Sequence, residues 1–554
     1  MSARPEPAGT GLTGPSAAAL DMANTAGPGL QPGRRHALQA LASLPLGPAG
    51  ALASQPALSR PGLASDFASA AASQALLTPF KGVTDAGGDL DCAQLATRGR
   101  WPAALAGRFY RNGPALYGRG GQRYHHWFDG DGMVQQFTLN GVAVAHRGRL
   151  VRTAKLHAEQ QAGRFLFDAF GSTMDRPLPI SGPNSINVAN TNPNAIEHAG
   201  RLLAMWEGGS AHAMSPGDLS TQGPITWRDD LRGVPFSAHP KLDASGHLWN
   251  FGTSGAQLVV WHIDPQGRLV DARVAESPFP GGMVHDMAVT ARHLVIPLPP
   301  IKLLFGQPSE GPRHFEMQAG QPLRILVIDK ADISLRRVFE LPPQLVFHVG
   351  NAFETQGGQI SLSFVGAPTP WFLNEGAVAP MQGQLGGTGP SFTQQVPLDL
   401  ATGRSQLQAF DDQVEFPWVH PQRIGQANRW LLRAASWGTD TGSGTGTGAG
   451  AGTGKTSARG AALLHGLQLR DLSTGRLRRH DYGDQTVVEE HVWVPKPVRS
   501  GELDAWPLGT TFDAHHQATV LNLLDAAPLE DGPIAQAQLP YVPPLGFHGN
   551  FTPA

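Results

Sequence analysis

Cysteine is almost absent from this chain of 554 residues, because Cys92 is the only one. A single thiol excludes an intramolecular disulfide and a zinc site built on several thiolates, so a bound metal would take mainly nitrogen or oxygen ligands. An excess of either charge is also missing. The formal net charge of -2 gives no global field for nucleic acid or an anionic membrane, and we expect no nucleic-acid partner. No uninterrupted apolar run of about 18 residues occurs, so no transmembrane helix is expected.

Turn-forming residues are abundant, with 68 glycines and 47 prolines, while hydrophobic residues make up 41% of the chain. This composition indicates a folded chain with many turns rather than a disordered one. Short apolar segments separated by acidic or glycine-rich turns recur, at residues 246–252, 258–264 and 323–329 for example. They predict an all-β protein in one large closed architecture. The pattern is typical of propeller blades, but the repeats are too irregular to count blades.

The first 85 residues are rich in alanine, glycine, proline and serine, and we expect most of this leader to be disordered, without a packed element. Arg34 and Arg35 precede a moderately apolar stretch that ends at Leu46, and a small-x-small sequence follows at 51–53. This resembles a bacterial twin-arginine export signal, although the leader is long and its apolar stretch is broken by Pro45. Export to the periplasm and a cytoplasmic low-complexity extension both stay open.

Two segments interrupt the strand pattern. Residues 296–306 are apolar but broken by prolines, so we expect an irregular loop. Such a loop would have one of three roles: an apolar entrance for a lipophilic substrate, a peripheral membrane contact, or a segment folded back onto the core. Residues 438–460 are almost entirely glycine, threonine, serine and alanine, which predicts a flexible insertion.

Four histidines stand in unusual settings. One lies in Val346-Phe347-His348-Val349, an apolar run that predicts a buried strand, where a histidine bonded to a backbone carbonyl is the structural alternative. The others are His239, His285 and His548. Successive spacings of 46, 63 and 200 residues exclude a local cluster, whereas a ring of sheets would bring them to one axis. Four neutral imidazoles suit iron, copper, nickel or zinc, and with six-coordinate iron they leave two positions open for dioxygen and a substrate or water.

Ligating imidazoles need their second nitrogen held, often by a carboxylate. Three glutamates lie in apolar surroundings, where an unpaired charge would be costly: Glu207, Glu415 and Glu490. Each alone would more often belong to an ordinary partly buried ion pair. With four isolated histidines, the set predicts a metal site with supporting carboxylates.

These residues lie in motifs that resemble the carotenoid cleavage oxygenases. The motifs occur in the family's order over about residues 99–549, within a domain that we place at 86–554. They are Arg111-Asn112-Gly113-Pro114, Phe128-Asp129-Gly130-Asp131-Gly132-Met133, Val151-Arg152-Thr153 with Lys155, Ala238-His239-Pro240-Lys241, His285-Asp286, Phe347-His348 with Asn351-Ala352-Phe353-Glu354, Glu415-Phe416-Pro417 and Gly546-Phe547-His548-Gly549.

The resemblance implies a seven-bladed β-propeller, capped by loops and short helices, with non-haem Fe²⁺ on its axis. The family's four iron-binding histidines fall on His239, His285, His348 and His548. Its three outer glutamates fall on Glu207, Glu415 and Glu490, and we expect them to hold His285, His348 and His548 in chain order. His239 would lack a carboxylate partner. The chain departs from the family at His491, where proline is common, and in its glycine-rich insertion.

The implied reaction is oxidative cleavage of a carbon-carbon double bond in a conjugated, largely apolar substrate, with O2 as co-substrate and two carbonyl products. Carotenoids and apocarotenoids would need a long apolar passage. Stilbene-type substrates would need a polar anchor, which Tyr124 or Lys155 would provide. Two further alternatives are a non-catalytic propeller that binds a lipophilic ligand around a structural metal, and double-bond isomerisation on the same scaffold.

Overall fold

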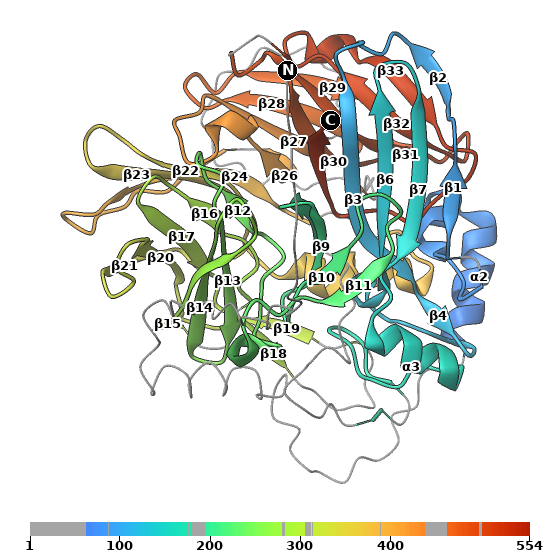
Figure 1. Ribbon diagram of the computed structural model, residues 1–554, viewed down its shortest axis with the longest axis horizontal. Coiled ribbons are helices and arrows are strands. Elements are labelled where there is room, and N and C mark those ends of the chain that lie inside the picture. The colour runs from blue at the N-terminus through green and yellow to red at the C-terminus, as the bar shows by residue number, and fades with distance from the viewer. Residues whose placement is uncertain are drawn as a thin grey trace, which may run out of the picture.

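Seven antiparallel sheets of four or five strands surround one axis in the computed structural model, so the predicted seven-bladed propeller is confirmed (Figure 1). The structure describes residues 62–554 except 87, 175–176, 179–193, 280–282, 305–311, 313, 388, 411, 438–462 and 498–500. The twin-arginine segment and the insertion predicted at 438–460 therefore lie outside the described residues.

The blades follow one another in chain order, and in each the first-named strand below lies nearest the axis. The second blade consists of β8 (Asn194–His198), β9 (Arg201–Met205), β10 (His212–Met214) and β11 (Thr221–Pro224). The third consists of β12 (Lys241–Leu242), β13 (Leu248–Ser254), β14 (Gln257–Ile263) and β15 (Leu269–Glu276). The fourth consists of β16 (Ala288–Val289), β17 (His293–Leu298), β20 (Leu323–Asp329) and β21 (Arg336–Leu341). The fifth consists of β22 (Leu345–Glu354), β23 (Gln359–Ala367), β24 (Phe392–Asp399) and β25 (Gln408–Ala409). The sixth is β26 (Gln413–Trp418), β27 (Trp430–Ser436), β28 (Gly466–Asp471), β29 (Leu477–Asp481).

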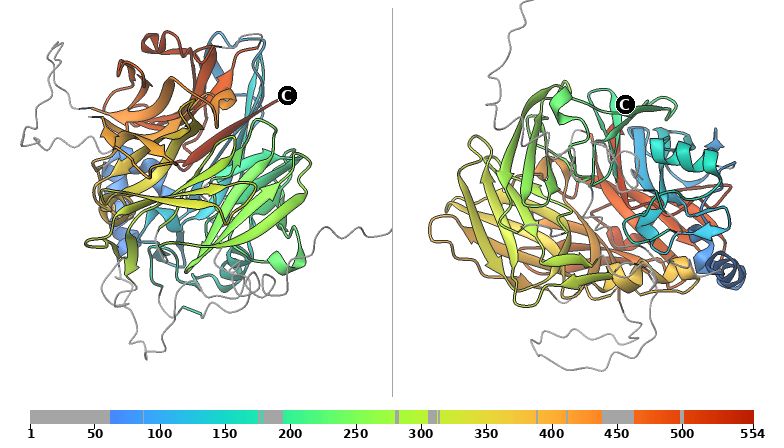
Figure 2. Two further views of the ribbon diagram at one scale, coloured as in Figure 1. Left: turned by 90° about the vertical axis from the view of Figure 1, so that its left-hand side faces the viewer. Right: turned by 90° about the horizontal axis from the view of Figure 1, so that it is seen from below.

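Both ends of the described chain close the ring. The first blade is β34 (His548–Pro553), β3 (Ala106–Leu116), β6 (Asp131–Asn140), β7 (Val144–Leu150) and β1 (Leu90–Cys92). The seventh is β30 (Thr486–Pro495), β31 (Ala505–Asp513), β32 (Ala518–Leu524), β33 (Pro533–Gln538) and β2 (Ala96–Gly99). The last strand thus becomes the innermost strand of the first blade, and an early strand completes the last blade. Figures 1 and 2 show these blue and red strands side by side.

Apolar side chains pack between adjacent blades. Phe251 and Leu258 of the third blade, for example, share a buried cluster with Ile296 and Leu326 of the fourth. Burying each such side chain contributes roughly 1.5–3 kcal/mol. Because a blade is apolar on both faces, only ring closure covers every face, and the inner strands are thereby held around the axis.

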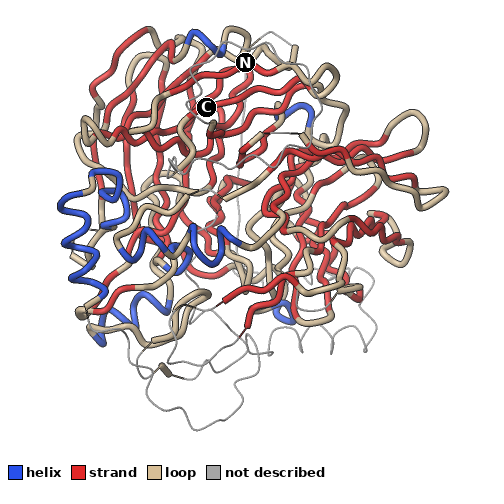
Figure 3. The backbone as a smooth tube through the Cα atoms, turned by 180° about the vertical axis from the view of Figure 1, so that it is seen from behind, coloured by secondary structure: helices blue, strands red, loops and turns tan. Residues whose placement is uncertain are grey.

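Short helices and two hairpins fill the remaining described chain, and Figure 3 shows how little helix there is. They are α2 (Leu63–Ser73), α3 (Ala154–Ala162), η1 (Ala75–Lys81), η2 (Trp127–Asp129), η4 (Asp229–Leu231), η5 (Phe372–Gly376), η6 (Ala379–Gln382), η7 (Pro421–Arg423), η8 (Leu529–Asp531), β4 (Gly118–Arg119) with β5 (Gln122–Arg123), and β18 (Ile301–Leu304) with β19 (His314–Met317). Several of them form a cap: Phe67 of α2, Phe80 of η1 and Met381 of η6 share an apolar cluster with Leu545 and Phe547. No helix in the described ranges is long and apolar enough to cross a membrane.

Two sequence predictions were wrong. The leader does contain a packed element, because α2 buries Leu63, Phe67 and Ala71. These residues recur every four positions, but small neighbours made the pattern weak. Residues 296–304 do not form an irregular loop, since 296–298 lie in β17, where Pro297 pairs with Ile325, and 301–304 form β18, with Pro299 and Pro300 between the two strands. Pro297 occupies a strand position although it cannot donate a ladder hydrogen bond there.

Candidate metal centre

Four blades bring one histidine each to the axis. His239 and His285 lie just before the inner strands β12 and β16, His348 lies within β22, and His548 is the first residue of β34. The inner strands contact one another around the ring. Histidines up to 309 residues apart in the chain, from His239 to His548, therefore become neighbours.

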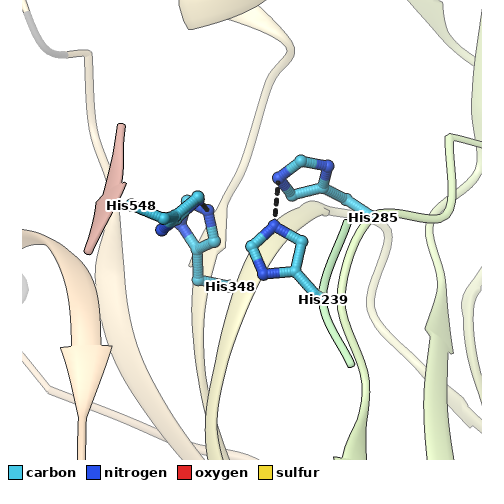
Figure 4. Close-up of side chains that lie close together, drawn as sticks. All are labelled: His239, His285, His348 and His548. Carbon is cyan, nitrogen blue, oxygen red and sulfur yellow. Dashed lines mark hydrogen bonds between the residues drawn. The ribbon is translucent and has the colours of Figure 1, made fainter. Parts of the chain in front are cut away.

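The four imidazoles converge. One nitrogen from each lies within 4.8 Å of those of the other three, an arrangement that could hold a metal ion (Figure 4). The Nε2 atoms of His239 and His285 are 3.0 Å apart, and those of His348 and His548 are 3.1 Å apart. All four side chains are at most 11% exposed. The structure thus brings together every histidine predicted as a ligand.

Three of the four imidazole rings have a glutamate carboxylate next to Nδ1. Nδ1 of His285 lies 2.9 Å from Glu207 Oε1, and Nδ1 of His348 lies 2.6 Å from Glu415 Oε2. His548 Nδ1 lies 3.0 Å from Glu490 Oε1. These are the chain-order pairs expected above. They orient each ring so that Nε2 faces the axis, as metal-binding histidines require. The side chain of Glu207 is 39% exposed, so its surroundings are less apolar than the sequence suggested.

His239 has a different neighbour. Its Nδ1 lies 3.8 Å from Asp286 Oδ1, beyond hydrogen-bond range, while Lys241 Nζ lies 2.8 Å from the same oxygen. The other Asp286 oxygen accepts a hydrogen bond of 2.7 Å from the backbone of Val349, next to His348. Asp286 therefore links the fourth and fifth blades beside the site. Its place in the His285-Asp286 motif did not reveal this role.

Burial favours the neutral form of two of the site imidazoles, those of His239 and His348. It holds the pKa of His239 and that of His348 well below the ordinary value, and the neighbouring site histidines lower both further. A neutral imidazole whose Nδ1 carries the proton presents a lone pair on Nε2. Burial also raises the pKa of Glu415 to about 8 in the metal-free protein. This donor set fits a divalent transition metal such as iron.

Three inner strands change register at a site residue. The shift lies around His348 in β22, after Glu415 in β26, and between Val488 and His491 in β30, which spans Glu490. A β-bulge re-aims a side chain that regular alternation would send to the opposite face. His491, at the position where the family commonly has proline, is part of this bulge, and Glu490 still reaches His548.

Phe416 has an unusual backbone conformation, with φ of 57° although it is neither glycine nor small, and it precedes Pro417. Left-handed backbone is costly for a bulky residue and is disfavoured before proline. Its amide donates a 2.8 Å hydrogen bond to Glu415 Oε2, the oxygen that faces His348. Its ring centroid lies 5.4 Å from that of His348. Phe416 thus fixes Glu415 and shields the site, a role that its sequence position did not reveal.

Further aromatic rings extend away from the site. Phe347 lies 5.5 Å from the ring of His285, and Phe128 and Phe372 lie 6.2 and 5.9 Å from Phe347. Phe128 and Phe372 are only partly buried. The surroundings of the histidines are therefore apolar on this side, which favours a hydrophobic ligand.

The proposed polar anchors are not free. Lys155 Nζ donates hydrogen bonds to Tyr124 Oη at 2.7 Å, Asp131 Oδ1 at 2.8 Å and Glu159 Oε2 at 2.9 Å. Tyr124 and Lys155 are at most 1% exposed. Both side chains are part of a buried ionic network with Asp131 and Glu159, in which Lys155 and Glu159 belong to α3, so an anchoring role for either in binding a phenol stays a prediction.

The fold and the site define a β-propeller with an axial four-histidine group suited to a metal ion. The chain belongs to the retinal pigment epithelial membrane protein family, whose model matches residues 86–553. It is 29% identical to the apocarotenoid-15,15'-oxygenase of Synechocystis over 82% of this chain and 92% of that protein. It is 27% identical to lignostilbene-alpha,beta-dioxygenase isozyme III of Sphingomonas paucimobilis, over 84% and 94%. A solved mutant of the Synechocystis apocarotenoid oxygenase superposes with a TM-score of 0.72 at 25% identity, covering 84% of this chain and 96% of that one.

Proposed function

We propose that this protein is a non-haem iron(II) dioxygenase that cleaves a carbon-carbon double bond of a carotenoid or apocarotenoid to two carbonyl products. The observation that carries the proposal is the convergence of four buried imidazoles, three of which have a carboxylate oxygen within 3.0 Å of Nδ1. His239, His285, His348 and His548 would hold the iron, and Glu207, Glu415 and Glu490 would orient three of them.

Iron bound here would supply activation of O2 beside the alkene. The side chains have a different task, which is to place one double bond and to exclude water. Phe347 and Phe416 lie against the histidine rings, and Phe128 and Phe372 extend the apolar surface. Apolar contacts, rather than an acid or a base, would therefore determine which bond is cleaved.

The hydrogen bonds that Tyr124 and Lys155 already make within the protein favour carotenoids over stilbenes as substrates. A phenol that bonds Lys155 would have to displace one of its three present acceptors, Tyr124, Asp131 or Glu159, and displacing a carboxylate would leave a buried charge unpaired at a cost of about 3–5 kcal/mol. An apolar chain makes no such demand. The likeness to the lignostilbene dioxygenase of Sphingomonas keeps stilbenes among the substrates to be compared.

The proposal is tested with protein purified anaerobically and loaded with Fe²⁺. We expect about one iron per chain, O2 consumption with an apocarotenal, and products whose masses show that the skeleton is split and oxygen is added. His348→Ala and His548→Ala should lose both metal and turnover. A matched control is His293→Ala, because His293 Nδ1 also lies 2.9 Å from a carboxylate, that of Glu354, but belongs to no metal group.

Four outcomes would contradict the proposal. Bound iron without cleavage of a carotenoid-type or a stilbene-type substrate refutes it. Full activity of His348→Ala or of His548→Ala refutes the assignment of that histidine as a metal ligand. A product of unchanged mass indicates isomerisation. Stoichiometric zinc with no O2 dependence indicates a propeller that binds a lipophilic ligand around a structural metal.

A further inference from the structure

Two consecutive buried glutamates, Glu489 and Glu490, face the same segment of chain. Regular strand geometry would point neighbouring side chains to opposite faces of the sheet. The register shift between Val488 and His491 falls on this pair. Both carboxylates therefore reach residues 546–549, the approach to His548 and the start of β34.

Glu490 contacts the end of that segment. Its Oε1 lies 3.0 Å from His548 Nδ1, and its Oε2 accepts a 2.6 Å hydrogen bond from the Gly549 amide. Glu489 contacts the beginning, since its Oε1 accepts a hydrogen bond from the Gly546 amide. The two carboxylates thus hold the segment on both sides of His548.

Arg111 completes the arrangement from the first blade. Its Nη2 lies 2.6 Å from Glu489 Oε1 and 2.7 Å from the Pro544 carbonyl oxygen. The side chains of Arg111 and Glu489 are only 3% and 5% exposed, and Thr510 also donates to the carboxylate. An ion pair that deep in the protein needs further hydrogen bonds, and Glu489 has them from Thr510 and Gly546, whereas Nε and Nη1 of Arg111 have no hydrogen-bond partner in the described structure.

Close packing leaves the segment little freedom. A Cβ on Gly546 would lie 2.7 Å from Arg111 Nε, and a Cβ on Gly113 would lie 2.5 Å from the Leu545 carbonyl oxygen. The Phe547 amide donates a 2.7 Å hydrogen bond to the Asn112 carbonyl oxygen. Residues 544–549 are therefore fixed against β3 and β30 together.

We propose that Arg111 and Glu489 are positioning residues of the metal centre, which set the place of His548 by clamping the chain just before it. His548 differs from the other three ligands because it lies on the last strand, which closes the ring. Without the clamp, its position would depend on β34 pairing, the Phe547 amide bond to Asn112 and Glu490. The proposal rests on metal binding by the four histidines.

The test measures Co²⁺ affinity, by competition with a chelator, together with the Co²⁺ absorption spectrum and the thermal midpoint of the metal-free protein. Glu489→Ala should weaken Co²⁺ binding about 10- to 100-fold, the usual effect of losing a residue that orients a ligand, and alter the spectrum. Glu489→Gln keeps an acceptor for the Gly546 amide, so it should recover most of the affinity.

Asp412→Ala is the matched control. Asp412 forms an equally buried pair with Arg433, at 2.5 Å and at most 1% exposure, and its carboxylate also contacts Arg470 and the Thr393 amide rather than a site histidine or glutamate. It should lower the thermal midpoint and leave Co²⁺ affinity unchanged. If Glu489→Ala does not fold, Arg111→Lys provides the measurement, because lysine keeps the charge but its shorter side chain does not place a donor where Arg111 Nη2 bonds both Glu489 and Pro544. We expect a 3- to 10-fold loss of affinity there.

The outcomes separate the two proposals. If the unsubstituted protein binds no Co²⁺ at the four histidines, the metal site itself is refuted. If it binds Co²⁺ and the variants at 111 and 489 bind equally well, or Asp412→Ala loses as much affinity as Glu489→Ala, the positioning role is refuted and the metal site stands.

Discussion

Removing the metal should make stability depend on the ionisation of Glu415. Its carboxyl group faces His348 at 2.6 Å, and burial raises its pKa from 4.5 to about 8 in the metal-free protein. Between those two values the folded state holds a proton that the unfolded state has released. The stability contributed by this protonated group is therefore fully present below about pH 4.5 and is lost as the pH rises toward 8.

The magnitude follows from one proton. Stability should fall by about 1.4 kcal/mol per pH unit where folded and unfolded protonation differ most, between roughly pH 5.5 and 7.5, or about 2–3 kcal/mol in all. Partial solvent access and proton sharing with His348 make this an upper bound. Other titrating groups, including the buried histidines, change stability over the same range, so the curve of one protein does not isolate Glu415.

Glu415→Gln isolates the effect because it keeps the shape and cannot ionise. Urea unfolding is measured between pH 5.5 and 7.5 for both metal-free proteins, and the difference in unfolding free energy is plotted against pH. We expect the unfolding free energy of Glu415→Gln to increase relative to that of the unsubstituted protein as the pH rises. A bound divalent cation favours the ionised carboxylate, so metal should abolish the trend. Parallel metal-free curves would refute this account of Glu415.

Three further predictions follow from other parts of the chain. Phe416→Ala should be less stable than Phe416→Gly by about 1 kcal/mol in urea unfolding, because only glycine relieves the left-handed backbone; a more stable alanine variant would contradict the φ of 57°. Lys155→Ala should lose about 3–5 kcal/mol of stability by leaving Asp131 and Glu159 unpaired, without a selective loss of phenolic substrates; a selective loss in the folded variant would support the anchor hypothesis. The leader around Arg34 and Arg35 is either an export signal, in which case the mature protein from the native host should lack it, or a cytoplasmic extension, in which case the intact mass should include it.

The sequence carried most of the site's chemistry. Isolated histidines in apolar runs, such as His348, need a partner whatever the fold, and a metal shared with His239, His285 and His548 satisfies all of them at once. Likewise, glutamates in apolar strands such as Glu415 and Glu490 pointed to buried partners. Motif order then gave the seven-bladed fold, because the resemblance covers nearly the whole domain.

Features that depend on small local departures were not predictable. A register shift is invisible in residue types, so nothing in the residue pattern showed that Glu489, like Glu490, contacts the His548 segment. The left-handed backbone at Phe416 breaks the local preferences of both phenylalanine and a residue before proline. Tertiary contacts outweigh such preferences at a few positions only.

Local composition also misjudged burial. The small residues of α2 and the prolines of 296–304 looked like unpacked chain, yet Phe67 and Ile296 are buried against distant segments. Lys155 looked available and is enclosed by carboxylates. The sequence by itself determined which side chains require partners, because desolvation cost belongs to the residue. Only the tertiary structure decided which residues are those partners, because ring closure and strand register set the distances between residues hundreds of positions apart.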